Sequence, residues 1–161
     1  MKRGGIVIAG AAVAGLAAVA ALAQQEKGDA PVDGVTFLGE PVTAEEIEAG
    51  RELYAETCAS CHGADLEGQA DWKRRLESGR MPAPPHDETG HTWHHSDQDL
   101  FVITKGGVEA VVSDYESDMP GFDGILSDDE IEAVLGYIKS TWPERQRAFQ
   151  AEITANEEEG S

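Results

Sequence analysis

The spacing of hydrophobic residues predicts helices joined by loops, and two of the helices open in the same way. Thr43 and Glu46 form a capping box before one helix. Ser127 and Glu130 form a second capping box before a segment whose apolar residues recur every three or four positions. Pro143 ends that repeat, whose apolar members are Ile131, Val134, Leu135, Ile138 and Trp142. No segment alternates convincingly as a strand, so the expected fold class is all-α.

A shorter helix is predicted in the middle of the chain, and long irregular segments lie on both sides of it. The short helix begins after Ser96 and closes at Gly106-Gly107. Residues 63–95 and 108–126 show no clear periodicity. Loops of that length are uncommon in a compact domain unless they bind something. We therefore expect these two segments to need a further component before they pack.

The N-terminal segment has the features of a secretory signal. A short positive region at Lys2 and Arg3 precedes an uncharged stretch, residues 4–23, which ends in Ala21-Leu22-Ala23 before Gln24. The 20 uncharged residues are also long enough for an uncleaved membrane anchor. They are mostly Ala and Gly, however, which favours cleavage before Gln24. The expected location is the periplasm, or the periplasmic face of the inner membrane if the segment is retained.

The rest of the chain divides into three parts. Residues 24–42 are predicted to be a linker, and residues 43–143 a single domain. Residues 144–161 are predicted to be a helical tail that frays into an acidic end at Glu157-Glu158-Glu159. The size of the middle part suits one domain with one core.

The composition is strongly acidic. Without residues 1–23 the chain has 138 residues, with 10 Lys and Arg against 31 Asp and Glu, a formal charge of −21. Such a charge argues against nucleic acid and anionic membrane surfaces as partners and favours basic protein surfaces. The acidic residues are scattered, so a general contribution to solubility explains them equally well.

The strongest chemical signal is Cys58-Ala59-Ser60-Cys61-His62, which contains the chain's only two cysteines. This C-x-x-C-H pattern is the attachment signature of a c-type haem, in which two thioether bonds tether the porphyrin and the histidine binds iron. A thioredoxin-like site would need a βαβ context. A zinc site is a weaker alternative, because 29 residues separate Cys61 from His91. A buried porphyrin would also give the long loops an apolar surface to wrap.

With this motif placed, the chain resembles the class I (mitochondrial-type) monohaem c-type cytochromes. Gly50 and Tyr54 stand where that family has a small residue and an aromatic residue before the haem motif. Val134 and Tyr137 match the apolar and aromatic positions of its C-terminal helix. Met119, in Met-Pro-Gly-Phe, matches the loop that brings a methionine sulfur to the iron.

The resemblance covers roughly residues 43–143 and implies a cytochrome c-like fold, with three to four helices and long loops wrapped around one covalent haem. It implies that Cys58 and Cys61 carry the haem c and that His62 and Met119 are its axial ligands. Met81 is a rival for the second position, because it also precedes a proline. The loop around Met119 matches the family's usage better, since Met81 lies much nearer to the haem motif.

Four of the five histidines lie between His86 and His95, next to a tryptophan. This segment departs from the plain family pattern, and three interpretations remain open. It could cover the haem, with Trp93 or a histidine donating to a propionate. The side chains of His91, His94 and His95 could instead bind a second metal, copper being plausible. The third interpretation is a pH-responsive contact surface.

The resemblance implies electron transfer between redox partners and no catalytic residue, because His/Met ligation fills the iron's coordination sphere. The donor and acceptor proteins are not named by the sequence, and the chain could serve as a subunit of an oxidoreductase complex. Two alternatives belong to other classes. One is a haem enzyme or gas sensor with an open iron site. The other is a metal-binding module in which the histidine segment is the functional part.

Overall fold

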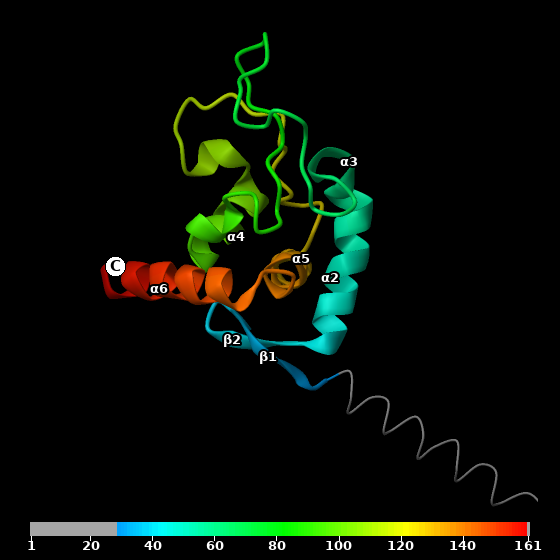
Figure 1. The fold of residues 1–161 in the computed structure, drawn as a ribbon, viewed down its shortest axis with the longest axis vertical. Helices are drawn as coiled ribbons and strands as arrows, with labels where there is room; N and C mark the ends of the chain where they lie inside the picture. The colour runs from blue at the N-terminus through cyan, green and yellow to red at the C-terminus, as the bar shows by residue number, and fades with distance from the viewer. Residues whose placement is uncertain (1–28, 161) are drawn as a thin grey trace, which may run out of the picture.

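The computed structural model describes residues 29–160, so the predicted signal segment and the start of the linker lie outside the described residues. A small antiparallel hairpin precedes the helices, which occupy most of the remaining regular structure (Figure 1). The elements in chain order are β1 (Pro31–Phe37), β2 (Glu40–Thr43), α2 (Ala44–Thr57), α3 (Ala59–His62), η1 (Thr92–His94), α4 (Asp97–Gly106), η2 (Val108–Ala110), α5 (Asp128–Ser140) and α6 (Glu144–Gly160).

The predicted helix starts are confirmed. Thr43 caps α2 and Ser127 caps α5, each with the reciprocal backbone and side-chain bonds of a capping box. Ser96 caps α4, where its hydroxyl accepts a hydrogen bond from the backbone N–H of Asp99 at 3.0 Å. The expected mostly helical architecture is also confirmed.

The hairpin corrects two predictions at once. Residues 31–43 form strands where no strand was expected, and Val35, Phe37 and Val42 are buried in the core rather than extended as a linker. The two-residue turn is Leu38-Gly39, with both φ angles positive, as a tight hairpin turn requires. Leucine is an uncommon residue in that conformation, which explains why the sequence gave no turn signal.

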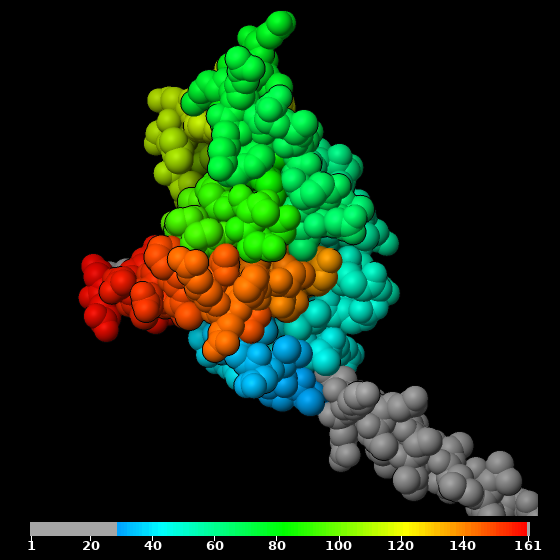
Figure 2. Space-filling model, viewed as in Figure 1, coloured from blue at the N-terminus to red at the C-terminus, as the bar shows by residue number. Residues whose placement is uncertain are grey.

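The C-terminal tail also differs from expectation. It is one continuous helix, α6, to Gly160 rather than a helix that frays into disorder. Figure 2 shows α6 lying as a band across one face, between the hairpin and the segment that leads into α4. One polar side chain of α6, Gln150, is completely buried, and it joins the helix to the body of the protein.

The packing of α2 against α5 is the main contact between helices in the core. Gly50 makes this packing possible, because a β-carbon there would lie 2.0 Å from the carbonyl oxygen of Ala133. Tyr54, one turn further along α2, is 1% exposed, and its ring lies 5.6 Å from that of Tyr137 on α5. The two helices therefore carry the haem motif at a fixed position relative to the core.

A buried ion pair joins three helices and the hairpin. Lys139 of α5 donates to both carboxylate oxygens of Asp97, at 2.8 and 3.1 Å, and the amide of Gln150 donates to the same carboxylate at 2.6 Å. The backbone N–H of Leu38 in the hairpin turn donates to Asp97 at 3.0 Å. Four hydrogen bonds from three donor groups satisfy the buried carboxylate, which stabilises an otherwise costly arrangement.

Within residues 29–160, the structure holds no helix that is long and apolar enough to cross a membrane.

Candidate functional site

The two cysteines of the motif lie where α2 passes into α3. Cys58 ends α2, where its backbone N–H donates to the carbonyl of Tyr54 at 2.9 Å, and it also starts α3. The backbone N–H of His62 returns to the carbonyl of Cys58 at 2.9 Å. Cys58 and Cys61 are not joined in a disulfide; the first thiol is half-buried and the second is exposed. This single helical turn holds both thiols and the imidazole in one short, rigid segment.

The imidazole of His62 is held in its neutral form. Its side chain is buried, and its Nδ1 lies 2.9 Å from the backbone carbonyl oxygen of Pro84. A carbonyl can only accept, so Nδ1 carries the proton and donates it, and Nε2 keeps a free lone pair. Burial lowers the pKa of His62, partly offset by this hydrogen bond. A neutral imidazole with a free Nε2 is the form that binds iron.

The carbonyl of Pro84 is fixed by glycines on both sides of the Pro84-Pro85 segment. A β-carbon on Gly68 would lie 2.4 Å from the nitrogen of Pro85, and one on Gly90 would lie 2.0 Å from its carbonyl oxygen. Gly68 also has a φ of +69°, which favours glycine. The close approach of three backbone segments thus sets the position of the acceptor that orients His62.

His86 lies against the same imidazole. Its ring is stacked on that of His62, with 4.0 Å between the centroids and 19° between the planes. A hydrogen bond of 2.8 Å joins its Nδ1 to the hydroxyl of Thr92. Burial, followed by the nearby His62 and His91, lowers the pKa of His86 well below the usual value. Two flat, neutral rings therefore pack face to face beneath the haem motif.

Met119 is half-buried on the loop between η2 and α5. It helps line a cavity of about 190 Å³ with residues of the α4–η2 junction. The loop is pinned to the end of α4: Phe122 and Asp123 donate their backbone N–H groups to the carbonyls of Thr104 and Lys105. Gly121 allows the approach, because a β-carbon there would lie 2.8 Å from the backbone of Gly106. The loop is therefore held firmly by backbone contacts.

The rival methionine lies close to the same loop. Arg80, just before Met81, forms an ion pair with Asp118, just before Met119. Both methionine segments therefore meet at this part of the surface, and the choice between them stays a prediction.

The three histidines proposed as a second metal site are not brought together as a ligand set. His91 stacks on Trp72, whereas His94 packs against Trp93 and Phe149, and His95 faces Asp99. Among residues 29–160, no three His, Cys, Asp or Glu side chains form a group that could hold a metal ion. The rings of His91 and His95 lie edge to face at 5.5 Å, while His94 packs against aromatic partners that a sequence pattern alone does not reveal.

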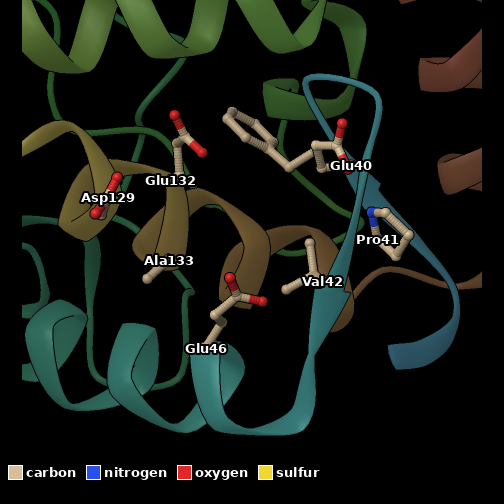
Figure 3. A pocket seen from close by; sticks show the side chains of 8 residues that line it. Glu40, Pro41, Val42, Glu46, Asp129, Glu132 and Ala133 are labelled. Atoms are coloured by element: carbon tan, nitrogen blue, oxygen red, sulfur yellow. The ribbon is translucent and has the colours of Figure 1, made fainter. Parts of the chain in front are cut away.

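A second pocket, of about 90 Å³, lies between the hairpin, α2 and α5 (Figure 3). It is lined in part by four carboxylate side chains, those of Glu40, Glu46, Asp129 and Glu132. Burial, followed by the neighbouring negative charges, raises the pKa of Glu132. This pocket shares no residue with the haem motif.

The residues around the motif fit a haem. The free Nε2 of His62 offers a ligand beside two thiols, as a covalently tethered porphyrin requires. The indole N–H of Trp93 is buried and has no hydrogen-bond partner among residues 29–160. A haem propionate is the kind of acceptor that satisfies such a donor.

The comparison with known proteins agrees with this fit. The family model described as cytochrome c matches residues 47–142, which is more than half of the chain. The chain belongs to the cytochrome c family. Its cofactor is haem c, attached through the Cys58 and Cys61 thiols of the C-x-x-C-H motif.

One relative of this cytochrome is a protein named nitrite reductase from Stutzerimonas stutzeri. The two are 30% identical over 100 residues, which are 62% of this chain but only 17% of that protein. The chain therefore spans about a sixth of the relative's length. No solved structure matches this cytochrome.

The sequence predicts the residues that attach and bind the haem but gives no signal for the groups that orient His62. Pro84, Gly68 and Gly90 have no motif of their own, because their role depends on backbone segments that meet only in the fold. His86 was noticed in the histidine segment without an assigned role. The stack on His62, which lies 24 positions earlier, has no counterpart in the sequence pattern.

Proposed function

We propose that this protein is a periplasmic electron carrier of the class I type, with His62 and Met119 as the two axial ligands of its haem iron. The observation that carries the proposal is the hydrogen bond from His62 Nδ1 to the carbonyl of Pro84, which leaves Nε2 free beside the two thiols. The backbone-pinned loop that carries Met119 supports a second ligand from the chain. The predicted signal segment supports export.

The chain's own residues have separate tasks in this mechanism. Haem c, when bound, supplies a one-electron couple between ferric and ferrous iron. Cys58 and Cys61 would hold it by thioether bonds, and the side chains of His62 and Met119 would bind its iron. Trp93 would donate its free indole N–H to a propionate. With two side chains bound to the iron, oxygen and other small ligands would find no open site, which suits a carrier rather than an enzyme.

The proposal is tested on the haem-loaded protein by spectroscopy. We expect a low-spin ferric spectrum, a near-infrared band from sulfur–iron bonding, and no ready binding of carbon monoxide or cyanide. Replacing Met119 by alanine should abolish the sulfur–iron band, whereas Met81→Ala should leave it in place. Loss of the band in the Met81 variant alone would reverse the assignment, and a high-spin wild type would favour an enzyme or sensor.

Location is tested separately. We expect the mature protein to begin at Gln24 and to be recovered from the periplasm, as intact mass and cell fractionation would show. Retention of residues 1–23 in a membrane fraction would instead identify an anchored carrier.

The likeness to a nitrite reductase supports a second, more specific role. We infer that the cytochrome delivers electrons to a reductase, either as a free carrier or as a subunit of the complex. Copurification from the native organism with a larger oxidoreductase would support the subunit, and rapid reduction followed by release would support the carrier.

A further inference from the structure

His86 occupies a place next to the haem motif that the proposed mechanism does not use. Its imidazole lies flat on one face of the His62 ring, at 4.0 Å between centroids and nearly parallel. The edge of His62 that carries Nδ1 is occupied by the carbonyl of Pro84. Two different contacts therefore act on the proposed ligand, one on an edge and one on a face.

His86 is itself held rigidly. Its backbone N–H donates to the carbonyl of Leu66 at 2.8 Å, and its carbonyl accepts from the indole of the fully buried Trp142 at 2.7 Å. Its ring is tied at Nδ1 to the hydroxyl of Thr92, which is also buried. With main chain and ring both fixed, His86 presents a stationary flat surface to His62.

The contacts around an axial histidine influence the orientation of its ring as well as its affinity for the iron. A single hydrogen bond at Nδ1 fixes the tautomer but opposes rotation of the ring only weakly. A flat ring packed on one face opposes rotation directly, because turning the imidazole would force the two rings into overlap. The direction of the imidazole plane at the iron determines which iron d-orbitals it overlaps, and hence the magnetic anisotropy of the ferric state.

We propose that His86 is a positioning residue that fixes the plane of the His62 imidazole at the haem iron by stacking on its face. The inference rests on the proposed binding of iron by His62. It goes further by assigning a task to a residue outside the haem motif, and it requires no change in the charge of either ring.

The test compares three variants of the haem-loaded protein by electron paramagnetic resonance of the ferric form. His86→Leu removes the flat ring and should change the spread of the g-values. His86→Phe keeps a flat ring of similar reach and should retain the wild-type g-values. His91→Leu is the matched control, because His91 stacks on Trp72 rather than on His62, and it should leave the spectrum unchanged.

A fourth variant keeps the test decisive if His86→Leu does not retain its haem. Thr92→Val removes the hydroxyl that holds the His86 ring but leaves the ring in place, so the g-values should shift in the direction seen for His86→Leu, by a smaller amount. A shift in both Thr92→Val and His86→Leu, with wild-type values in His86→Phe, supports the proposal.

Other results overturn it. Unchanged g-values in His86→Leu or in Thr92→Val would show that the stack does not set the ring plane. An equal shift of the g-values in His86→Phe and His86→Leu would show that the flat shape of the ring does not determine the g-values. Failure of the proposed function is seen separately, in the wild type, as a spectrum without a low-spin signal before any variant is compared.

Discussion

The hairpin side of the molecule (β1, β2, α5 and α6) and the motif side (residues 58–95 and 107–126) are built differently. The hairpin side closes a core from its own apolar side chains, among them Val35, Phe37, Ile131, Val134, Ile138 and Trp142. On the motif side the buried hydrophobic residues, apart from prolines, are Leu66 and Phe122. There the chain is positioned by glycines, prolines and backbone hydrogen bonds instead.

This difference shows where the haem contributes to the fold. Loops with few buried apolar side chains do not offset the entropy of ordering their backbone. A covalently held porphyrin supplies the missing apolar surface, so the motif side depends on the cofactor and the hairpin side does not. The comparison can be tested by perturbing each side in turn.

The largest effect is expected from Cys58→Ser/Cys61→Ser, which removes both thioether bonds. Without the tether the haem should be lost, and amide hydrogens in residues 63–95 should exchange far faster than in the wild type. Amide hydrogens in α5 should stay protected much longer, because α5 packs mainly against α2, α4 and β1. Hydrogen–deuterium exchange measured by mass spectrometry checks this.

Equal loss of protection on both sides would contradict the comparison. In that case the hairpin side would also need the haem, and the whole chain would unfold as one unit.

The next largest effect is expected from Asp97→Ala, which breaks the buried ion pair on the hairpin side. Lys139 would then keep an unpaired buried charge, and the donors on Leu38 and Gln150 would lose this acceptor. Removing one partner of such a pair typically costs about 3–5 kcal/mol in the free energy of unfolding. Urea denaturation followed by circular dichroism measures it.

The control is Asp128→Ala, which breaks the exposed pair between Lys105 and Asp128. Exposed ion pairs are screened by water, so this variant should unfold close to the wild-type urea concentration. A similar loss in both variants would mean that Asp97 contributes no more than a surface residue.

The buried carboxylate of Asp97 illustrates which features of the fold could be predicted from the sequence and which could not. Each capping box joins two residues three positions apart in the chain, Thr43 with Glu46 and Ser127 with Glu130, and both were predicted correctly. The hairpin turn at Leu38 is held by Asp97, 59 positions away, and it was missed. A capping box can be recognised in the sequence because its two residues are close together in the chain. The turn at Leu38 depends on Asp97, which comes close to it only in the folded protein.

The haem site divides in the same way. The residues of the C-x-x-C-H motif are adjacent in the chain and were identified at once. Pro84 and His86, which orient His62, come from a loop more than 20 residues away. Sequence patterns therefore predicted the chemistry of the site, whereas the contacts of Pro84 and His86 with His62 could be found only in the structure.

A smaller effect is expected where the two sides meet, at the packing of α2 on α5. Gly50→Ala places a methyl group 2.0 Å from the carbonyl oxygen of Ala133, so the helices must separate. Overpacking of this kind typically costs about 1–3 kcal/mol, partly offset by alanine's better helix propensity. Thermal unfolding should show a lower midpoint.

Gly160→Ala is the matched control, since a β-carbon there meets nothing within 4 Å. It should unfold at the wild-type temperature. An unchanged midpoint in Gly50→Ala would mean that the helices do not pack as closely as described.

The smallest effect is expected from Tyr54→Phe, which removes the single hydrogen bond that joins α2 to the residue after the haem motif. The Tyr54 hydroxyl donates to the carbonyl of Gly63 at 2.9 Å, a contact worth about 1 kcal/mol. Burial raises the pKa of Tyr54 above its usual value of 10.0, so the folded protein keeps the hydroxyl protonated at a pH where the unfolded chain loses the proton.

The sign of the pH effect follows from this shift. Below pH 10 the hydroxyl is protonated in both states, and wild type should be more stable than Tyr54→Phe. Above pH 10 the unfolded state ionises first, so the stability contributed by Tyr54 declines as the pH rises, whereas phenylalanine contributes no such change. The gap between the two proteins in urea denaturation should therefore narrow from pH 9 to about pH 11. A constant gap would show that this tyrosine ionises alike in both states, and that the motif side is open to water at its junction with α2.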